Sequence, residues 1–273
     1  MNILTCFKIV SDLDLMSESD WVVEDHFRIN TSFVKNMINP YDESALEITL
    51  LYKEQAEKLG SAVNLSALTI GSKQLDAYLK TLYALRFDKA VRIENQHDLR
   101  FSPDAISTVI ANYVKVIKKP EVIILGRQSG VGDNAKTPLL VAEHLGWPCI
   151  SQAVKIEPAS EGLLKVSSMA DDGLVIETIR PPCVLSIGNA PNSYLRIPTL
   201  KDKVNYGKKE IEVLEIENYL NQAVLEQPSE GHNITGLKPI NHKRQGVVIE
   251  GSTPAEKAQN LYHNYLQERL KQL

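Results

Sequence analysis

The chain has 273 residues, of which 43% are hydrophobic and 23% charged, and its formal net charge is −4. These values are ordinary for a globular protein with one large domain or two small ones. The acidic balance excludes the broad basic field with which proteins hold nucleic acid or an anionic membrane.

The cysteines and the N-terminal residues predict a soluble protein of the cytoplasm. Cys6, Cys149 and Cys183 form no CxxC pair, which gives no zinc signature and argues against a disulfide framework. The first residues, MNILTCFKIVSDLDLM, lack the basic start and the long apolar core of a signal peptide. No window approaches the roughly 20 apolar residues of a membrane span.

From the N-terminus to about residue 150, short apolar runs alternate with helical patterns. Strands are expected over 2–10, 61–70, 89–94 and 121–125. Helices are expected from near Asp42, over 103–118 and over 137–145. This alternation predicts an α/β fold with an open, mostly parallel sheet that is covered by helices on both faces. Ligands in such sheets bind beyond the carboxyl ends of the strands.

After residue 150 the pattern predicts an antiparallel addition to the sheet and a C-terminal arm. Short β-rich runs lie at 151–158, 163–169, 173–182 and 183–188. A long loop follows, and 226–252 is a polar stretch typical of an extended arm. Thr253 and Glu256 form a capping box that opens a final helix, whose apolar face packs on its own domain or on a partner subunit. We expect one domain over 1–225 and an arm with a helix over 226–273, which packs on a partner subunit.

The stretch LGRQSGVGDNAKTPLLVAEHLGWP, residues 125–148, combines small and polar residues between an apolar run and a helix. Residues 130–137 approach the P-loop pattern G-x-x-x-x-G-K-[ST], but Ala135 stands where the second glycine belongs and the strand ends too early. These differences exclude an ATPase. A weaker prediction remains, because the first turn of a helix at Thr137 offers backbone N–H groups and a positive dipole end to an anion. The alternative is a plain strand–loop–helix turn.

The same stretch resembles the nucleotide loop of the electron transfer flavoprotein β subunits (the FixA family), which typically has LG-[KR]-Q, then D-[GD]-D, and a helix ending in L-x-W-P. Other segments resemble that family in the same order. They are ILTCFKIVSD (3–12), MINPYDESALEITLLYKE (37–54), YALRFDKAVRIE (83–94), ADDGLVIETIRPPCVLSI (170–187) and YLRIPTLKDK (194–203). The resemblance covers about 1–215 and implies the fold of that family, which is similar to the adenine-nucleotide α-hydrolases.

Members of that family form one half of a heterodimer, so the resemblance implies an electron carrier subunit and not an enzyme. FAD lies mainly in the α subunit, and the β subunit holds AMP or, in electron-bifurcating types, a second FAD. The sequence has no metal-ligand cluster and no catalytic set of side chains, so it needs a borrowed cofactor to carry electrons. The resemblance also implies transient contacts with redox partners such as dehydrogenases. Two alternatives stay open: a bifurcating subunit with its own FAD and an NADH site, and a stand-alone nucleotide-binding regulator.

The resemblance implies a position for the adenine nucleotide and for a docking loop. Ile70 would lie beside the adenine, and the small residues after Ser129 would admit the phosphate. The expected cofactor-binding residues are Cys6, Asn39, Pro40, Tyr41, Asp42, Ile70, Ser129, Gly130, Val131, Gly132, Asp133, Asn134, Ala135, Lys136, Thr137, Pro138, Leu139 and Leu140. The expected docking residues for redox partners are Tyr194, Leu195, Ile197, Pro198 and Leu200, with Ile197 as the apolar anchor.

Departures from the family pattern indicate a divergent subgroup. Val131 stands in place of an aspartate of the phosphate loop, and Ser11 stands in place of a proline after the first strand. Met169 replaces a glutamate that can pair with an arginine of the α subunit. The usual dehydrogenase partners of the family therefore do not follow from the resemblance.

Overall fold

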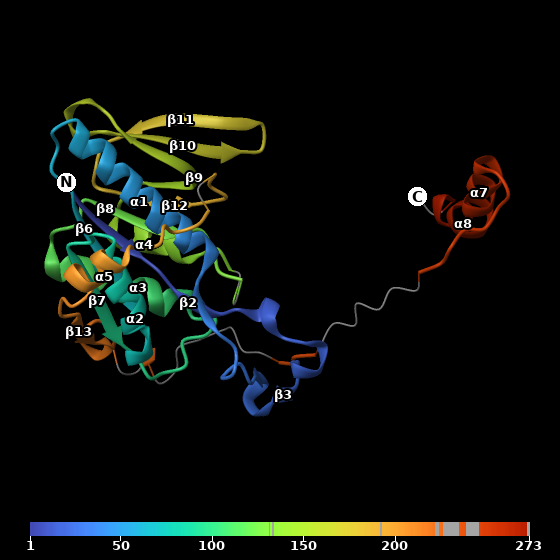
Figure 1. Cartoon of the computed structure of the whole chain (residues 1–273), viewed down its shortest axis with the longest axis horizontal. Helices are drawn as coiled ribbons and strands as arrows, with labels where there is room; N and C mark the ends of the chain where they lie inside the picture. Colours follow the sequence, from blue (N-terminus) through green and yellow to red (C-terminus); the bar gives the residue numbers. More distant parts are fainter. Residues whose placement is uncertain are drawn as a thin grey trace. The chain divides into compact units, whose positions relative to one another are not determined.

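The computed structural model describes residues 1–130, 132, 134–191, 193–221, 224–225, 235–238 and 246–271. The chain divides into two compact units, Met1–Thr235 and Gly236–Leu273. The first unit carries the sheet with its helices, and the second carries the C-terminal helical segment (Figure 1). None of the helices in these described ranges is long and apolar enough to cross a membrane.

The described residues of the first unit form a nine-stranded sheet with the order β11-β10-β9-β12-β8-β1-β6-β7-β13. The strands are β1 (Asn2–Cys6), β6 (Asn64–Ile70), β7 (Lys89–Glu94), β8 (Val122–Gly126), β9 (Cys149–Pro158), β10 (Leu164–Ala170), β11 (Gly173–Ile179), β12 (Cys183–Ile187) and β13 (Glu212–Glu215). The seven strands β9-β12-β8-β1-β6-β7-β13 pair in parallel with their neighbours. Strand β8 lies at the centre and is buried along its whole length, as its apolar run predicted.

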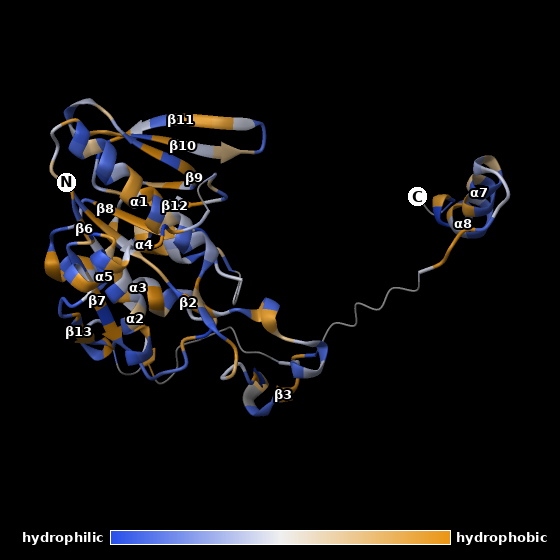
Figure 2. Ribbon diagram, viewed as in Figure 1, coloured by the Kyte–Doolittle hydropathy of each residue, from blue (hydrophilic) through white to orange (hydrophobic). Residues whose placement is uncertain are grey.

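Helices cover both faces of the sheet, which confirms the predicted fold class (Figure 1). The first face carries α1 (Pro40–Lys58) and α2 (Asp76–Ala84), and the second carries α3 (Pro103–Ile117) and α4 (Thr137–Leu145). Successive residues of each strand point to opposite faces. Ile3 therefore packs in the core under α1, whereas Leu4 packs in the core under α3. Figure 2 shows the apolar residues concentrated in the strands between the two helical layers.

The first predicted strand, over 2–10, is wrong in its extent. The structure divides it into β1 and β2 (Ile9–Ser11), and β2 pairs with β5 (Asn36–Ile38) in a separate small sheet. The physical reason is a contact from a distant part of the chain. The backbone N–H of Lys8 donates to Asp42, and the carbonyl of Lys8 accepts from the N–H of Asn39, so the chain leaves the main sheet at this point.

The antiparallel addition to the sheet is confirmed for β9, β10 and β11, which pair antiparallel in this order. The prediction that the run at 183–188 belongs to this antiparallel addition is wrong, because strand neighbours cannot be read from local periodicity. The run forms β12, which lies between β8 and β9 and is parallel to both. Strand β11 is an exposed edge strand whose apolar residues include Leu174 and Ile176 (Figure 2). A short helix, α5 (Leu200–Tyr206), lies inside the long loop predicted after residue 188 and packs against α2.

The remaining short elements surround the main sheet or form the second unit. Strands β3 (Val23–Glu24) and β4 (Arg28–Ile29) make a small hairpin. The second unit contains α7 (Pro254–Leu261), a π-helical turn (Tyr262–Leu266) and α8 (Gln267–Leu270). The hydroxyl of Thr253 accepts from the N–H of Glu256 at 3.2 Å, and the Glu256 carboxylate accepts from the N–H of Ser252 at 2.8 Å. Most of the predicted arm, 226–234 and 239–245, lies outside the described residues.

Candidate functional site

A cavity of about 350 Å³ lies at the carboxyl ends of β1, β6, β7 and β8. Cys6 ends β1, Ile70 ends β6 and Gly126 ends β8, and all three residues line the cavity. Parallel sheets bind ligands at this edge. The volume lies near the lower end of the roughly 300–1,000 Å³ that is usual for ligand pockets.

The structure brings part of the expected cofactor site together around this cavity. The expected residues that line it are Cys6, Asn39, Asp42, Ile70, Ser129, Gly132, Asn134, Thr137 and Pro138. The described residues that do not line it are Pro40, Tyr41, Gly130, Ala135, Lys136, Leu139 and Leu140. Val131 and Asp133 lie outside the described residues. The four segments singled out in the sequence therefore converge, although they are far apart along the chain.

Asp42, in the first turn of α1, lines the cavity and connects α1 with the ends of β1 and β8. Its carboxylate accepts from the backbone N–H of Gly126 at 2.8 Å, from the N–H of Lys8 at 2.9 Å and from the Asn39 amide at 3.1 Å. Burial raises the pKa of Asp42 to about 6, although these hydrogen bonds act in the opposite direction. A Cβ at position 126 would lie 2.5 Å from the Asp42 carboxylate, so the contact requires glycine. The main role of Asp42 is to hold β1, α1 and β8 together.

Three buried polar atoms of cavity-lining residues have no hydrogen-bond partner among the described residues. They are Asn39 Oδ1, Thr69 Oγ1 and Arg127 Nε. The Asn39 amide nitrogen is fixed, because it donates to the carbonyl of Gln128 at 2.8 Å, and this leaves the oxygen as a free acceptor. A buried polar atom without a partner costs about 1–3 kcal/mol. All three atoms belong to residues that line one cavity, so a polar ligand bound there is a candidate partner for them.

The start of α4 borders the cavity, which Thr137 and Pro138 line. The helix begins at Thr137 with Pro138 in its first turn and ends at Gly146, whose φ of 66° is left-handed, as predicted. In the preceding loop, Gly132 and Ala135 have φ values of 93° and 52°. The Asn134 side chain accepts from the N–H of Lys136 at 3.0 Å and orders the last part of this loop. The first N–H groups of a helix lack partners within the helix and attract an anion.

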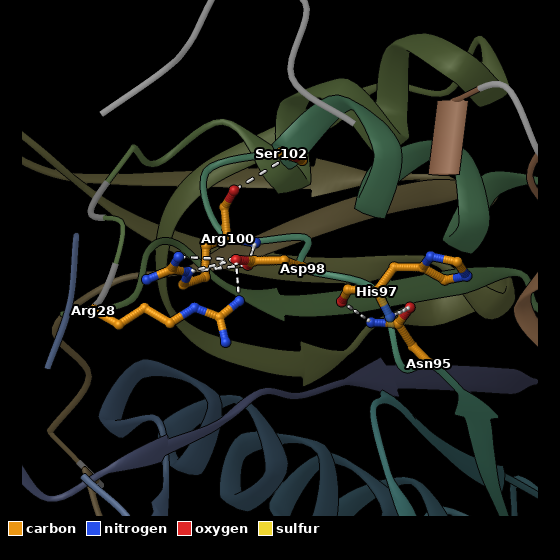
Figure 3. A network of polar contacts seen from close by, with 6 residues as sticks. All are labelled: Arg28, Asn95, His97, Asp98, Arg100 and Ser102. Carbon is orange, nitrogen blue, oxygen red and sulfur yellow. Dashed lines mark hydrogen bonds and ion pairs between the residues drawn. The ribbon is translucent and has the colours of Figure 1, made fainter. Parts of the chain in front are cut away.

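The loop after β7 forms a wall of the cavity that sequence reasoning missed. Its lining residues are Asn95, His97, Asp98, Leu99, Arg100, Phe101 and Ser102. Figure 3 shows the side chains of Arg28 and Arg100 converging on Asp98. Burial alone would raise the pKa of Asp98, but the hydrogen bonds from Arg100 and Arg28 lower it to about 2. A signal was present, because the carboxyl end of the strand over 89–94 is as eligible for a ligand as the other strand ends.

The charged groups that line the cavity favour an anion. The lining contains three cations, Lys8, Arg100 and Arg127, and two carboxylates, Asp42 and Asp98. Arg127 is held by Gln152, which accepts from its guanidinium at 2.9 Å, and the guanidinium lies 5.1 Å from the centre of the Tyr41 ring. No cluster of His, Cys, Asp or Glu within the described ranges could hold a metal ion.

The expected docking residues separate into exposed and buried side chains. Tyr194, Ile197 and Leu200 are 81%, 87% and 78% exposed. Leu195 packs against the core, and Pro198 is buried. The loop thus exposes three apolar side chains to solvent, while Leu195 and Pro198 pack towards the protein interior.

Comparisons with known proteins agree with the motifs. A family model described as an electron transfer flavoprotein domain matches residues 27–218. The chain is 29% identical over 274 residues to YgcR of Escherichia coli, which covers 99% of this chain and all of the relative. It is 25% identical over 282 residues to the acryloyl-CoA reductase electron transfer subunit gamma of Anaerotignum propionicum, which covers 99% of this chain and all of the relative.

A third relative is the electron transfer flavoprotein subunit beta of Bacillus subtilis. It is 30% identical over 234 residues, which cover 82% of this chain and 84% of the relative. The family match and these relatives confirm the resemblance that the motifs predicted. The chain belongs to the electron transfer flavoprotein family, as an electron transfer subunit of the β type.

Proposed function

We propose that this chain holds an adenine nucleotide in the strand-end cavity and, with an FAD-carrying α-type subunit, shuttles electrons between dehydrogenases and an acceptor. The observation that supports the nucleotide is that three residues with unpartnered buried polar atoms line the same cavity as the first turn of α4. The described residues hold no metal-ligand cluster, so the chain would act as a carrier subunit that depends on a bound cofactor for electron transfer. A location in the cytoplasm stays a prediction from the sequence.

The residues of the cavity divide the work of binding. The apolar side chains of Leu68 and Ile70 would cover the adenine ring, while Asn39 Oδ1 and Thr69 Oγ1 would meet its polar edge or the ribose. The loop from Ser129 and the start of α4 would receive the phosphate. A flavin, when bound, supplies electron transfer, and the protein residues bind, orient and exclude water.

The cavity of about 350 Å³ would take the adenosine phosphate that AMP and FAD share. In FAD this part is extended by another phosphate, a ribityl chain and a ring system, which would lie outside the cavity, so we propose AMP as the simpler occupant. The bifurcating alternative would need room for that extension and for NADH beside it. A stand-alone regulator would need no α-type subunit at all.

The decisive experiment uses the heterodimer purified with its α-type subunit. The complex is denatured, and the released nucleotides are identified and counted by chromatography and mass spectrometry. One FAD and one AMP per heterodimer is the expected result. Two FAD would establish the bifurcating alternative, and a chain that copurifies with neither partner nor nucleotide would refute the proposal.

A pair of threonine variants tests the cavity itself. Thr69→Val removes an unpartnered buried hydroxyl, so the AMP content should fall while the free energy of unfolding is unchanged or slightly raised. Thr5→Val is the matched control on the neighbouring strand. The Thr5 hydroxyl has a hydrogen-bond partner, the Thr49 hydroxyl at 2.9 Å, and Thr5 does not line the cavity. The control should lower stability by about 1 kcal/mol and leave the AMP content unchanged. The reverse pattern would place the nucleotide elsewhere.

The exposed side chains of the docking loop are proposed to contact the dehydrogenase. One apolar anchor suits a brief encounter, in which fast release matters more than affinity. Ile197→Ala should raise the KM of the dehydrogenase for the heterodimer, with little change in kcat. Val116→Ala on α3, also an exposed aliphatic side chain, is the control and should change neither constant. Equal KM values for the two variants would remove Ile197 from the docking surface.

We propose that the segment over 226–273 packs against the α-type subunit, in line with the expectation from the sequence. The final helix exposes apolar side chains along its length, namely Leu261, Tyr262, Tyr265, Leu266 and Leu270. A face of this composition needs a cover. Deleting 246–273 should weaken copurification with the α-type subunit, while the nucleotide bound to the first unit is retained.

A further inference from the structure

Glu47 is a buried acid that takes no part in the strand-end cavity. It lies on α1 and is 7% exposed. Its carboxylate accepts from the Arg196 guanidinium at 2.7, 3.0 and 3.1 Å, and from the backbone N–H of Arg196 at 3.0 Å. A second carboxylate, Glu54, contacts the other side of the same guanidinium. One buried acid therefore binds both the main chain and the side chain of a single loop residue.

This contact holds the docking loop directly beside its apolar anchor. Arg196 precedes Ile197, the most exposed of the large hydrophobic residues in the described ranges. The hydrogen bonds that Arg196 donates to the Glu47 carboxylate raise the pKa of Arg196, so the guanidinium stays charged. The fork of an arginine on a carboxylate fixes direction as well as distance, because both of its hydrogen bonds must be in plane.

The other end of the loop is fixed by independent contacts. The Thr199 hydroxyl accepts from the N–H of Asp202 at 3.1 Å and caps α5. Asp202 accepts from Arg86, which follows the end of α2, at 3.2 Å, and the Arg86 guanidinium lies 3.5 Å from the centre of the Tyr206 ring. Pro198 is buried between these two anchors. Ile197 thus projects from a short span that is held on both sides.

We propose that Glu47 is a positioning residue for redox-partner docking, which sets the direction of Ile197 by holding Arg196. The inference rests on the proposed docking role of Ile197. A loop that is already ordered loses less conformational freedom when a partner binds, so its affinity is higher. Glu47 acts through Arg196 and does not touch the partner. It should therefore affect the KM for the dehydrogenase and leave the kcat of electron transfer unchanged.

The test compares variants of the full heterodimer. Glu47→Gln keeps the size of the side chain but loses its charge and one of its two accepting oxygens. We expect the KM for the dehydrogenase to rise about tenfold with kcat within about twofold, as for loss of a preorganised binding loop. Hydrogen exchange at the backbone amides of 194–199 should become faster, and the nucleotide content should stay the same. Glu54→Gln is the matched control, because Glu54 makes no contact with the loop backbone in the described structure, and it should change KM much less.

A double variant protects the test against simple unfolding. Glu47→Gln with Arg196→Gln leaves no buried charge unpaired, so it should fold and show the same rise in KM. Faster exchange of 194–199 with an unchanged KM would overturn the positioning role, provided that Ile197→Ala still raises KM. If Ile197→Ala leaves KM unchanged, the proposed docking loop fails first, and the role of Glu47 fails with it.

Discussion

Two loops leave neighbouring strands of the sheet, and they are fixed in different ways. The loop after β8 starts at Gly126 and is tied by its backbone, since the N–H of Arg127 donates to the carbonyl of Ile187 and the carbonyl of Gln128 accepts from Asn39. The loop after β12 starts at Gly188 and is tied mainly by charged side chains, with Arg196 on Glu47 and Asp202 on Arg86.

The difference fits the functions proposed for the two loops. In the proposed function the loop after β8 receives a phosphate, for which small residues and free backbone N–H groups are suited. The loop after β12 presents Ile197 in the proposed docking role, and the ion pairs of Arg196 and Asp202 would keep it ordered before a partner arrives. Both loops rest on α1, because Asn39 and Asp42 lie at its start and Glu47 little more than one turn further along.

Gly126→Ala should break the base of the first loop and have the largest effect. The added Cβ would lie 2.5 Å from the Asp42 carboxylate and 2.7 Å from the backbone carbon of Tyr41, and neither neighbour can move easily. We expect the free energy of unfolding to fall by about 3 kcal/mol and the bound nucleotide to be lost. In Gly130→Ala the Cβ meets no described atom within 4 Å, so urea denaturation should differ from wild type by at most about 0.5 kcal/mol. Equal losses in the two variants would contradict the steric argument.

Asp42→Asn should have the next effect and a distinct pH dependence. The amide presents an N–H group to donors at Lys8 and Asn39, which should cost about 2 kcal/mol at pH 7. The folded pKa of about 6 lies above the ordinary value of 3.8, so the folded wild type binds this proton more tightly than the unfolded chain. Wild-type stability therefore falls as pH rises from about 4 to 6, by roughly 3 kcal/mol from this group. The difference in unfolding free energy between wild type and Asp42→Asn should therefore become smaller as pH rises from about 4 to 6. A difference that stays constant in urea denaturation over this range would contradict the raised pKa of Asp42.

Much of the fold was predictable because its signals are local. The apolar periodicity gives β7 and α3, and Pro138 with Gly146 marks the two ends of α4. Strand order and direction are not local, so the parallel placement of β12 between β8 and β9 was missed. The end of β1 depends on the contact between Lys8 and Asp42, which periodicity cannot detect.

The candidate site was predictable only where a motif marks it. Small residues and a helix start drew attention to the loop after β8. The wall after β7 has no such motif, and its charged residues resemble an ordinary solvated turn. Phe101 there adopts a left-handed φ of 59°, which the sequence does not indicate. Lys8 and Arg127 line the cavity because of which strands are neighbours, and that is a property of the tertiary structure.

Gly188→Ala tests whether the bases of the two loops are equivalent. Its Cβ would lie 2.6 Å from Gln152 Oε1 and 3.2 Å from Gln152 Cα. The nearest atom is the end of a flexible side chain that can turn away, so we expect a loss of about 1–2 kcal/mol, less than for Gly126→Ala. Gln152 also holds Arg127, so its displacement should lower the nucleotide content as well. Measured nucleotide at the wild-type level would show that Arg127 does not depend on Gln152.

Asp98→Asn should have the smallest effect, because its ion pairs are partly exposed. Asp98 joins Arg28 of β4 to Arg100 of the cavity wall, with N–O distances of 2.6 and 2.8 Å (Figure 3). The folded pKa of about 2 lies below the ordinary 3.8, so the contribution is present above about pH 4 and is lost as pH falls towards 2. After allowance for solvent screening, the variant should be less stable than wild type by about 1 kcal/mol at pH 7.

The difference between this variant and wild type should narrow in urea denaturation as the pH is lowered from 4 to 2, and it should also narrow in high salt. Either trend in the opposite direction would mean that the two arginines do not stabilise the Asp98 carboxylate. The nucleotide content distinguishes a variant of the cavity wall from a variant of the docking loop. It should fall slightly in Asp98→Asn, because the cavity wall loses its anchor, and stay constant in Glu47→Gln, whose ion pair holds only the docking loop.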